Sequence, residues 1–77
     1  MRKKYIPSVT SQNTIKVFEA ETGQLYKMVQ CGNGKIAGQP IITDKEMYVE
    51  MIEAGDKKVI KYFSLPNFML TKSVPVC

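Results

Sequence analysis

The chain has 77 residues, a formal net charge of +4, and neither histidine nor tryptophan. A chain of this length forms one small domain over residues 1–77 and buries only roughly 60% of its extended-chain surface on folding. Its hydrophobic fraction of 44% excludes a wholly disordered protein. A partner is therefore the expected further source of stability.

Localisation is predicted from the first residues and from hydropathy. The segment 5–13 that follows the basic residues 2–4 is too polar to be the apolar core of a signal peptide. No apolar run approaches the ~20 residues that a membrane-spanning helix needs. We expect a cytoplasmic or virion protein that does not contact a membrane.

Short runs of β-branched and aromatic residues alternate with Gly, Pro, Asn and Asp, which is typical of strands joined by turns. A helix over residues 15–30 is disfavoured by the Thr22-Gly23 break and by the β-branched flanks. The sequence predicts seven strands, at residues 4–10, 14–19, 24–30, 36–43, 47–53, 58–64 and 69–76.

The first strand contains Pro7, which cannot donate a hydrogen bond to a neighbouring strand and is therefore confined to edges or bulges. Two interpretations of Pro7 remain open. Either residues 4–10 form an edge strand that the proline protects from unwanted pairing, or Pro7 ends a basic tail and the strand begins later.

The strands at 47–53 and 58–64 are apolar on both sides. Met47, Val49 and Met51 share one face, whereas Tyr48 and Ile52 lie on the other beside a glutamate. Strands that are buried on both faces lose the alternation of apolar and polar residues. This pattern predicts sheets that are covered on both sides.

Two parts of the chain repeat each other 45 residues apart. Residues 15–18 and 25–29 match residues 60–63 and 70–74, and Ile, Lys, Phe, Leu, Lys and Val recur without an insertion. A period near 40–45 residues with strand-like units is typical of β-propeller blades. Repeat unit one covers about residues 4–31, and repeat unit two covers about residues 36–77.

Further short motifs are spread over both repeat units. They are Gly38-Gln39-Pro40, Asp44, Tyr48-Val49, Gly55-Asp56, residues 60–63, Tyr5-Ile6, Asn13 and Thr22-Gly23. Together they resemble the propeller repeats named after a Tyr-Val-Thr-Asn signature, which are related to WD-repeat and quinoprotein-like blades. Glu50-Met51 stands where that signature has Thr-Asn, and Pro66-Asn67 replaces Thr-Gly in the second copy.

This resemblance implies an all-β fold of two propeller-like antiparallel blades, the first with three strands and the second with four. We expect the first blade to lack its innermost strand, because nothing precedes residue 4 to form it. Repeat units need neighbours to bury their faces. Oligomerisation with closed symmetry would complete the stack.

The sequence contains no strong motif for phosphate binding or catalysis. Residues 32–35 read Gly-Asn-Gly-Lys but lack the spacing of a phosphate-binding loop. The carboxylates of Asp44, Glu46, Glu50 and Glu53 have no histidine or nucleophile at a recognisable spacing. We expect neither an enzyme nor a cofactor.

The two cysteines, Cys31 and Cys77, are too few for a disulfide framework. Each is interpreted as a small residue at a strand end. An interchain disulfide through Cys77 is the alternative. Two thiols without histidine do not predict a metal site.

The predicted function is a structural or interaction module that forms a homo-oligomeric ring or docks into a larger assembly, such as a phage virion. The context of a virion rests on small size and implied symmetry alone. The predicted interface residues are Tyr5, Ile6, Pro7, Val9, Met47, Val49, Met51 and Tyr62.

Two other functions are weighed against this one. A ligand- or glycan-binding, lectin-like protomer is disfavoured because the chain has no tryptophan for sugar stacking. A nucleic-acid-binding β-module would use basic side chains against phosphates, but a solvated basic face explains the same charges. The candidate nucleic-acid contacts are Arg2, Lys3, Lys4, Lys57 and Lys58.

Overall fold

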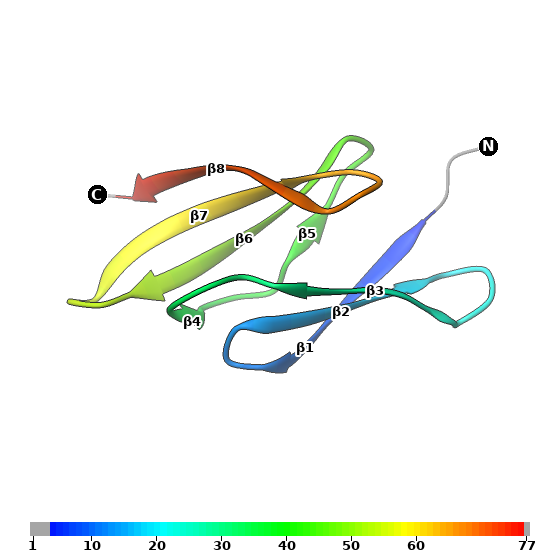
Figure 1. The fold of residues 1–77 in the computed structure, drawn as a ribbon, viewed down its shortest axis with the longest axis horizontal. Helices are drawn as coiled ribbons and strands as arrows, with labels where there is room; N and C mark the ends of the chain where they lie inside the picture. Colours follow the sequence, from blue (N-terminus) through cyan, green and yellow to red (C-terminus); the bar gives the residue numbers. More distant parts are fainter. Residues whose placement is uncertain (1–3, 77) are drawn as a thin grey trace.

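The computed structural model describes residues 4–76, and these residues form an all-β protein of eight strands (Figure 1). The described part of the chain contains no helical span that could cross a bilayer. The strands are β1 (Tyr5–Ser11), β2 (Thr14–Glu19), β3 (Leu25–Gln30), β4 (Lys35–Ile36), β5 (Ile41–Ile42), β6 (Glu46–Glu53), β7 (Lys57–Ser64) and β8 (Met69–Val76).

The strands form two antiparallel sheets. The smaller sheet has three strands in the order β1-β2-β3, and the larger has five, with β4-β6-β7-β8 in order and β5 also paired with β6. The all-β class is therefore confirmed. Two packed antiparallel sheets occur in several all-β architectures, so this pairing does not distinguish propeller blades from a sandwich.

One predicted strand is wrong in detail. Residues 36–43 do not form one strand but two short ones along the same edge of β6, where Ile36 pairs with Met51 and Ile41 pairs with Tyr48. The gap contains Pro40, which has no N–H to donate and interrupts the ladder. The larger sheet consequently has five strands rather than the predicted four.

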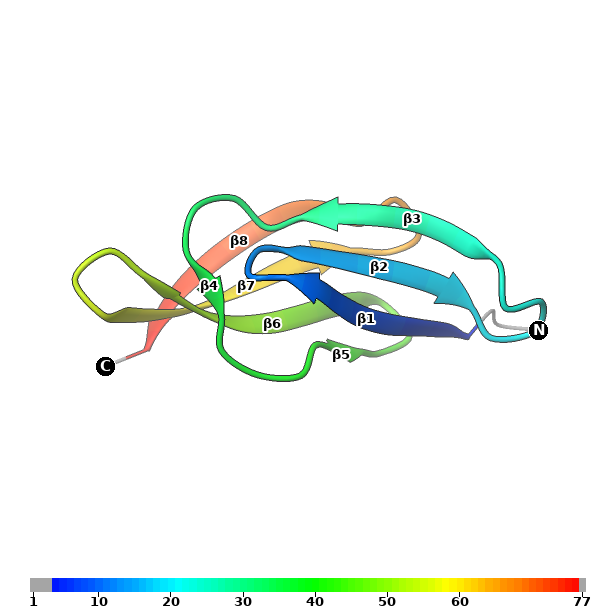
Figure 2. The same cartoon turned by 90° about the horizontal axis from the view of Figure 1, so that it is seen from below.

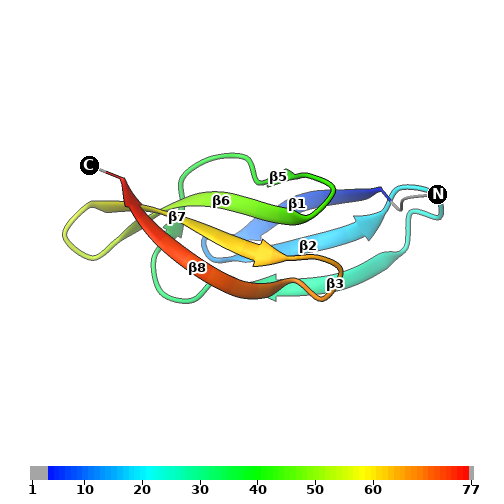
Figure 3. The same ribbon diagram turned by 90° about the horizontal axis from the view of Figure 1, so that it is seen from above.

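The two sheets lie face to face with their strands in the same order. From above and from below, β1, β2 and β3 follow one another across the molecule in the same direction as β6, β7 and β8 (Figures 2 and 3). β1 and β3 are the edges of the smaller sheet, and β8 is an edge of the larger one. Pro7 lies within β1 opposite Val17, so the edge-strand interpretation of this proline is confirmed.

The core lies between the sheets. β2 contributes alternate side chains from one face, and β6 and β7 do the same, as expected from the two-residue period of a strand. The opposite faces of these strands are only half-buried. The sequence predicted that residues 47–53 and 58–64 are covered on both sides. Within this chain, only the side that faces the smaller sheet is fully covered. The core residues are Ile15, Val17, Val29, Cys31, Met47, Val49, Met51, Val59, Phe63 and Phe68.

The hairpins β2–β3 and β7–β8 share the same irregularity. In β2 the register against β3 shifts between Val17 and Phe18, and in β7 the register against β8 shifts between Tyr62 and Phe63. Such a bulge bends a strand and increases its twist. The two shifts lie 45 residues apart in the chain.

The turns of these hairpins also share a conformation. The N–H of Gly23 donates to the carbonyl of Glu19 at 2.8 Å, and the N–H of Phe68 donates to the carbonyl of Ser64 at 2.6 Å. Gly23 has a φ of 73°, and Phe68 has a φ of 56°. The left-handed region is natural for glycine but strained for phenylalanine.

Aromatic packing holds Phe68 in this conformation. Its buried ring lies 5.6 Å from the ring of Tyr5 and 6.0 Å from the ring of Tyr26 (centroid distances). The hydroxyl of Tyr26 donates to the carbonyl of Pro66 at 3.0 Å. The β7–β8 turn is therefore attached to β1 and β3, and the cluster joins the ends of the two sheets.

Candidate functional site

The most distinctive surface is the side of the larger sheet that points away from the core, here called the outer face of the larger sheet. Cross-strand register places Glu50 beside Ile60, and Ile60 beside Val74. None of these three side chains is buried. The outer face of the larger sheet consists mainly of Ile41, Tyr48, Glu50, Ile52, Lys58, Ile60, Tyr62, Lys72, Val74 and Val76.

One row of side chains across this face contains two tyrosine rings and a lysine. The ring centroids of Tyr48 and Tyr62 lie 5.6 Å apart across β6 and β7. The ammonium of Lys72 lies 4.6 Å from the centroid of the Tyr62 ring. Cross-strand aromatic pairs and cation–π contacts each stabilise such a row modestly. The row therefore presents two neighbouring aromatic rings with one ammonium held over Tyr62.

A pocket of about 330 Å³ opens on the same face. The residues that line it are Gly38, Gln39, Ile41, Tyr48, Glu50, Ile60 and Val76. The side chain of Glu50 is the one charged group in the lining. The pocket thus combines apolar walls with a single carboxylate, a composition that suits a cation on an aliphatic stem.

The smaller sheet also has an apolar outer face. Ile6, Leu25 and Met28 are each about half exposed, at 53%, 50% and 50%. Phe18 pairs with Ile6 in β1 and with Leu25 in β3, and Lys16 pairs with Met28. The outer face of the smaller sheet is therefore defined by Ile6, Lys16, Phe18, Leu25 and Met28.

A buried lysine links the two sheets. Lys61 is only 7% exposed, and its Nζ donates to the carbonyl oxygen of Cys31 at 2.7 Å. The same Nζ lies 3.5 Å from Oε2 of Glu53. A buried ammonium needs a hydrogen-bond acceptor and a countercharge, and these two groups provide them. The larger sheet contributes the lysine and the glutamate, and the chain just after β3 contributes the carbonyl.

Sequence reasoning missed the position of Lys61. The signal was present, because Val59, Lys61 and Phe63 alternate along β7 and must share one face. A lysine between two core residues on one strand is a candidate for burial.

Two groups near this core have shifted pKa values. Burial raises the pKa of the Cys31 thiol, and the Lys61 ammonium opposes that shift. Burial also raises the pKa of the Tyr5 hydroxyl, and its hydrogen bond with Tyr26 adds to the effect. Both groups are therefore held in the protonated form over a wider pH range than usual.

The predicted interface residues occupy different environments. Met47, Val49 and Met51 lie in the protein's own core, so they are not part of a free surface. Tyr62 lies on the outer face of the larger sheet. From β1, only Ile6 belongs to an outer face as defined above.

The rest of β1 points elsewhere. Tyr5 packs in the aromatic cluster with Tyr26 and Phe68. Pro7 and Val9 pair with Val17 and Ile15, which face the core. The predicted interface on β1 therefore divides between the two sides of the strand.

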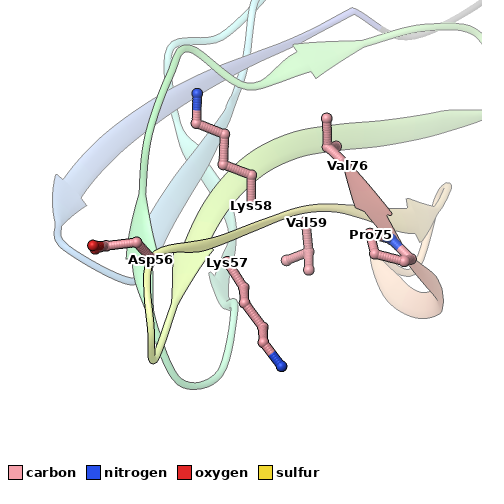
Figure 4. Close-up of a pocket in the computed structure, with 6 residues that line it drawn as sticks. All are labelled: Asp56, Lys57, Lys58, Val59, Pro75 and Val76. Carbon is pink, nitrogen blue, oxygen red and sulfur yellow. The ribbon is translucent and has the colours of Figure 1, made fainter.

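The candidate nucleic-acid contacts do not converge. Lys57 and Lys58 line a pocket of about 420 Å³ with Asp56, but their side chains extend to opposite sides of β7 (Figure 4). Lys4 is exposed and directly precedes β1, which begins at the opposite end of the molecule from the β6–β7 turn (Figure 1). Arg2, Lys3 and Cys77 lie outside the described residues, and so does the predicted disulfide of Cys77.

Metal ligands do not gather in residues 4–76, where no group of three or more His, Cys, Asp or Glu side chains could hold an ion. No protein-family model, curated protein or solved structure matches the chain significantly. The candidate site therefore rests on the two outer faces and on the chemistry of their side chains.

Proposed function

We propose that this protein is a non-enzymatic structural protomer that stacks head-to-tail on copies of itself, in a propeller-like arrangement. The observation that carries the proposal is a reversal of burial between positions 45 residues apart. Ile15 is fully buried, whereas its counterpart Ile60 is only half-buried. Val29 is 4% exposed, whereas its counterpart Val74 is 39% exposed.

Stacking geometry explains this reversal. When equivalent units stack in the same orientation, the front of one contacts the back of the next. A residue on the front of one unit is then buried in the contact between the units, whereas the matching residue on the front of the next unit points away from that contact. A pair related by a twofold axis would instead bury the same residues in both units. The reversal therefore favours head-to-tail packing of the two sheets.

Backbone features support the equivalence of the two units. The register shift at Val17 and Phe18 has its counterpart at Tyr62 and Phe63. The hydrogen bonds that close the two hairpin turns are also spaced by the same 45 residues. These correspondences support the propeller-like repeat that the sequence predicts.

The same geometry supports one cover for the exposed faces. The outer face of the larger sheet is equivalent to the inner face of the smaller sheet, which packs against the larger sheet within the chain. The complementary surface is therefore the outer face of the smaller sheet in a second copy. This surface carries half-exposed apolar side chains, including Ile6, Leu25 and Met28. Such a heterologous contact repeats from copy to copy and yields a ring or a filament.

A charged substitution on the outer face of the larger sheet tests this proposal. We expect the wild-type protein to form a defined multimer at micromolar concentration in native mass spectrometry and sedimentation velocity. Val74→Asp should be monomeric, because it places a charge in the apolar contact. Ala54→Asp adds the same charge in an exposed turn away from both outer faces and should keep the multimer.

Circular dichroism would establish that both variants keep their β-structure. A wild-type protein that stays monomeric throughout the micromolar range would overturn the proposal. A Val74→Asp variant that assembles as well as Ala54→Asp would also overturn it.

A further inference from the structure

The pocket on the outer face of the larger sheet corresponds to an occupied position inside the protein. Within the chain, Lys61 extends from the larger sheet and its Nζ donates to the carbonyl of Cys31 beside the smaller sheet. The position 45 residues after Cys31 is Val76, which lines the pocket. The position 45 residues before Lys61 is Lys16, on the outer face of the smaller sheet.

We propose that this pocket receives the side chain of Lys16 from a second copy of the chain. Its Nζ donates to the main-chain carbonyl of Val76 and forms an ion pair with Glu50. This inference rests on the proposed head-to-tail stacking and names the polar contact within it. The occupant is a primary ammonium on an aliphatic stem, as at the Lys61 position.

The composition of the pocket supports this occupant. Ile60 and Tyr48 supply apolar walls for the lysine stem, and Glu50 supplies a countercharge. Within the chain, Oε2 of Glu53 lies 3.5 Å from Nζ of Lys61 and supplies its countercharge. Glu50 would do the same for Lys16, but the two residues would come from different copies of the chain. Without a countercharge, burial of the ammonium would be strongly unfavourable.

Two lysines of this face, Lys58 and Lys72, do not belong to the pocket lining. Lys72 is held over the ring of Tyr62. Lys58 lies opposite Val76 in the register and lines the adjacent pocket near Asp56, which shares Val76 with this one (Figure 4). Glu50 is thus the one charged side chain in the lining of the pocket.

Lys16 itself is available for the contact. It is partly exposed, and it lies in the middle of β2 between Ser8 in β1 and Met28 in β3. Lys16 and Glu50 lie on the outward sides of the two different sheets. A direct contact between them therefore requires two chains.

Charge reversal tests the pairing. We expect Lys16→Glu and Glu50→Lys each to lower the association constant of the wild-type assembly at least about tenfold, the equivalent of 1.4 kcal/mol. The double variant should regain most of the lost affinity, because the opposite charges again face each other. The matched controls are Lys57→Glu and Glu21→Lys, which make the same charge changes at exposed positions off the outer faces.

A zero-length carbodiimide cross-link gives an independent readout. The wild-type assembly should yield a peptide in which the Lys16 amine is joined to the Glu50 carboxylate, and Lys16→Met should abolish it. If a charge-reversed variant does not fold, the neutral variants Lys16→Met and Glu50→Gln replace it in the affinity measurement.

The outcomes separate the two proposals. A wild-type protein that does not associate overturns both of them. An assembly that forms, but that Lys16→Glu and Glu50→Lys leave within about twofold of the wild-type affinity, overturns the lysine pairing alone. The lysine pairing is also overturned if the double variant does not regain affinity, or if the cross-link is absent from an intact assembly.

Discussion

The hairpins β2–β3 and β7–β8 have equivalent backbones but bury opposite sides. Their register shifts and turn hydrogen bonds coincide after an offset of 45 residues. In β2 the core side chains are Ile15 and Val17, whereas in β7 they include Val59 and Phe63. Local sequence therefore determines the shape of each hairpin, and the neighbouring sheet determines which side is buried.

The largest difference should appear in the two equivalent isoleucines. In a monomeric Val74→Asp background, Ile15→Ala should lower the free energy of unfolding by about 3 kcal/mol, because it removes a fully buried side chain and leaves a cavity. Ile60→Ala should cost less than about 1.5 kcal/mol, since Ile60 is only half-buried there. Urea denaturation measures both. Equal losses would contradict the reversal of burial.

The two hairpin turns should differ by a smaller amount. Phe68→Gly relieves a left-handed phenylalanine but removes a buried ring from the aromatic cluster, for an expected net loss of about 2–3 kcal/mol. Gly23→Ala should cost about 1 kcal/mol, because space is available for its Cβ and only the positive φ opposes it. Thermal or urea unfolding distinguishes them. A stabilising Phe68→Gly would mean that strain outweighs the ring contacts.

The equivalent lysines provide the next comparison. In the same background, Lys61→Met should lower the free energy of unfolding by about 1–2 kcal/mol, because the carbonyl of Cys31 loses its donor. Lys16→Met should change it by less than about 0.5 kcal/mol, as expected for a surface position. Denaturation curves with equal slopes would make the comparison valid. A larger effect at Lys16 than at Lys61 would reverse the assignment of buried and exposed lysines.

The smallest expected effect is a pH dependence from Tyr5. Its pKa is raised above the ordinary 10.0 by burial and by the hydrogen bond with Tyr26, so the folded protein holds the phenolic proton more tightly than the unfolded chain. The resulting stability is complete below pH 10.0 and is lost as the pH rises through the raised value. Tyr5→Phe should therefore flatten the alkaline limb of the stability curve.

Unfolding free energies measured between neutral and alkaline pH test this expectation, with Tyr48→Phe as a control that removes a phenol outside the cluster. An alkaline limb that Tyr5→Phe leaves unchanged would argue against a role for this hydroxyl.

Much of the architecture was predictable from the sequence. Local preferences, which depend on residues close together in the chain, were enough to predict the all-β class and six of the seven expected strands. They also predicted the turns and the edge position of Pro7. The break of residues 36–43 into β4 and β5 could have been anticipated from Pro40, because proline has no donor for the ladder. The 45-residue spacing of the matching residues was likewise visible from residue types alone.

Only the tertiary structure decided which sides of the strands face each other. It placed Lys61 in the core and Met47 in the protein's own interior, and it left Ile60 and Val74 on the surface. Strand propensity and turn chemistry set the backbone locally, whereas the burial of a face depends on a sheet that is distant in the sequence. Matching residues 45 positions apart therefore have different environments.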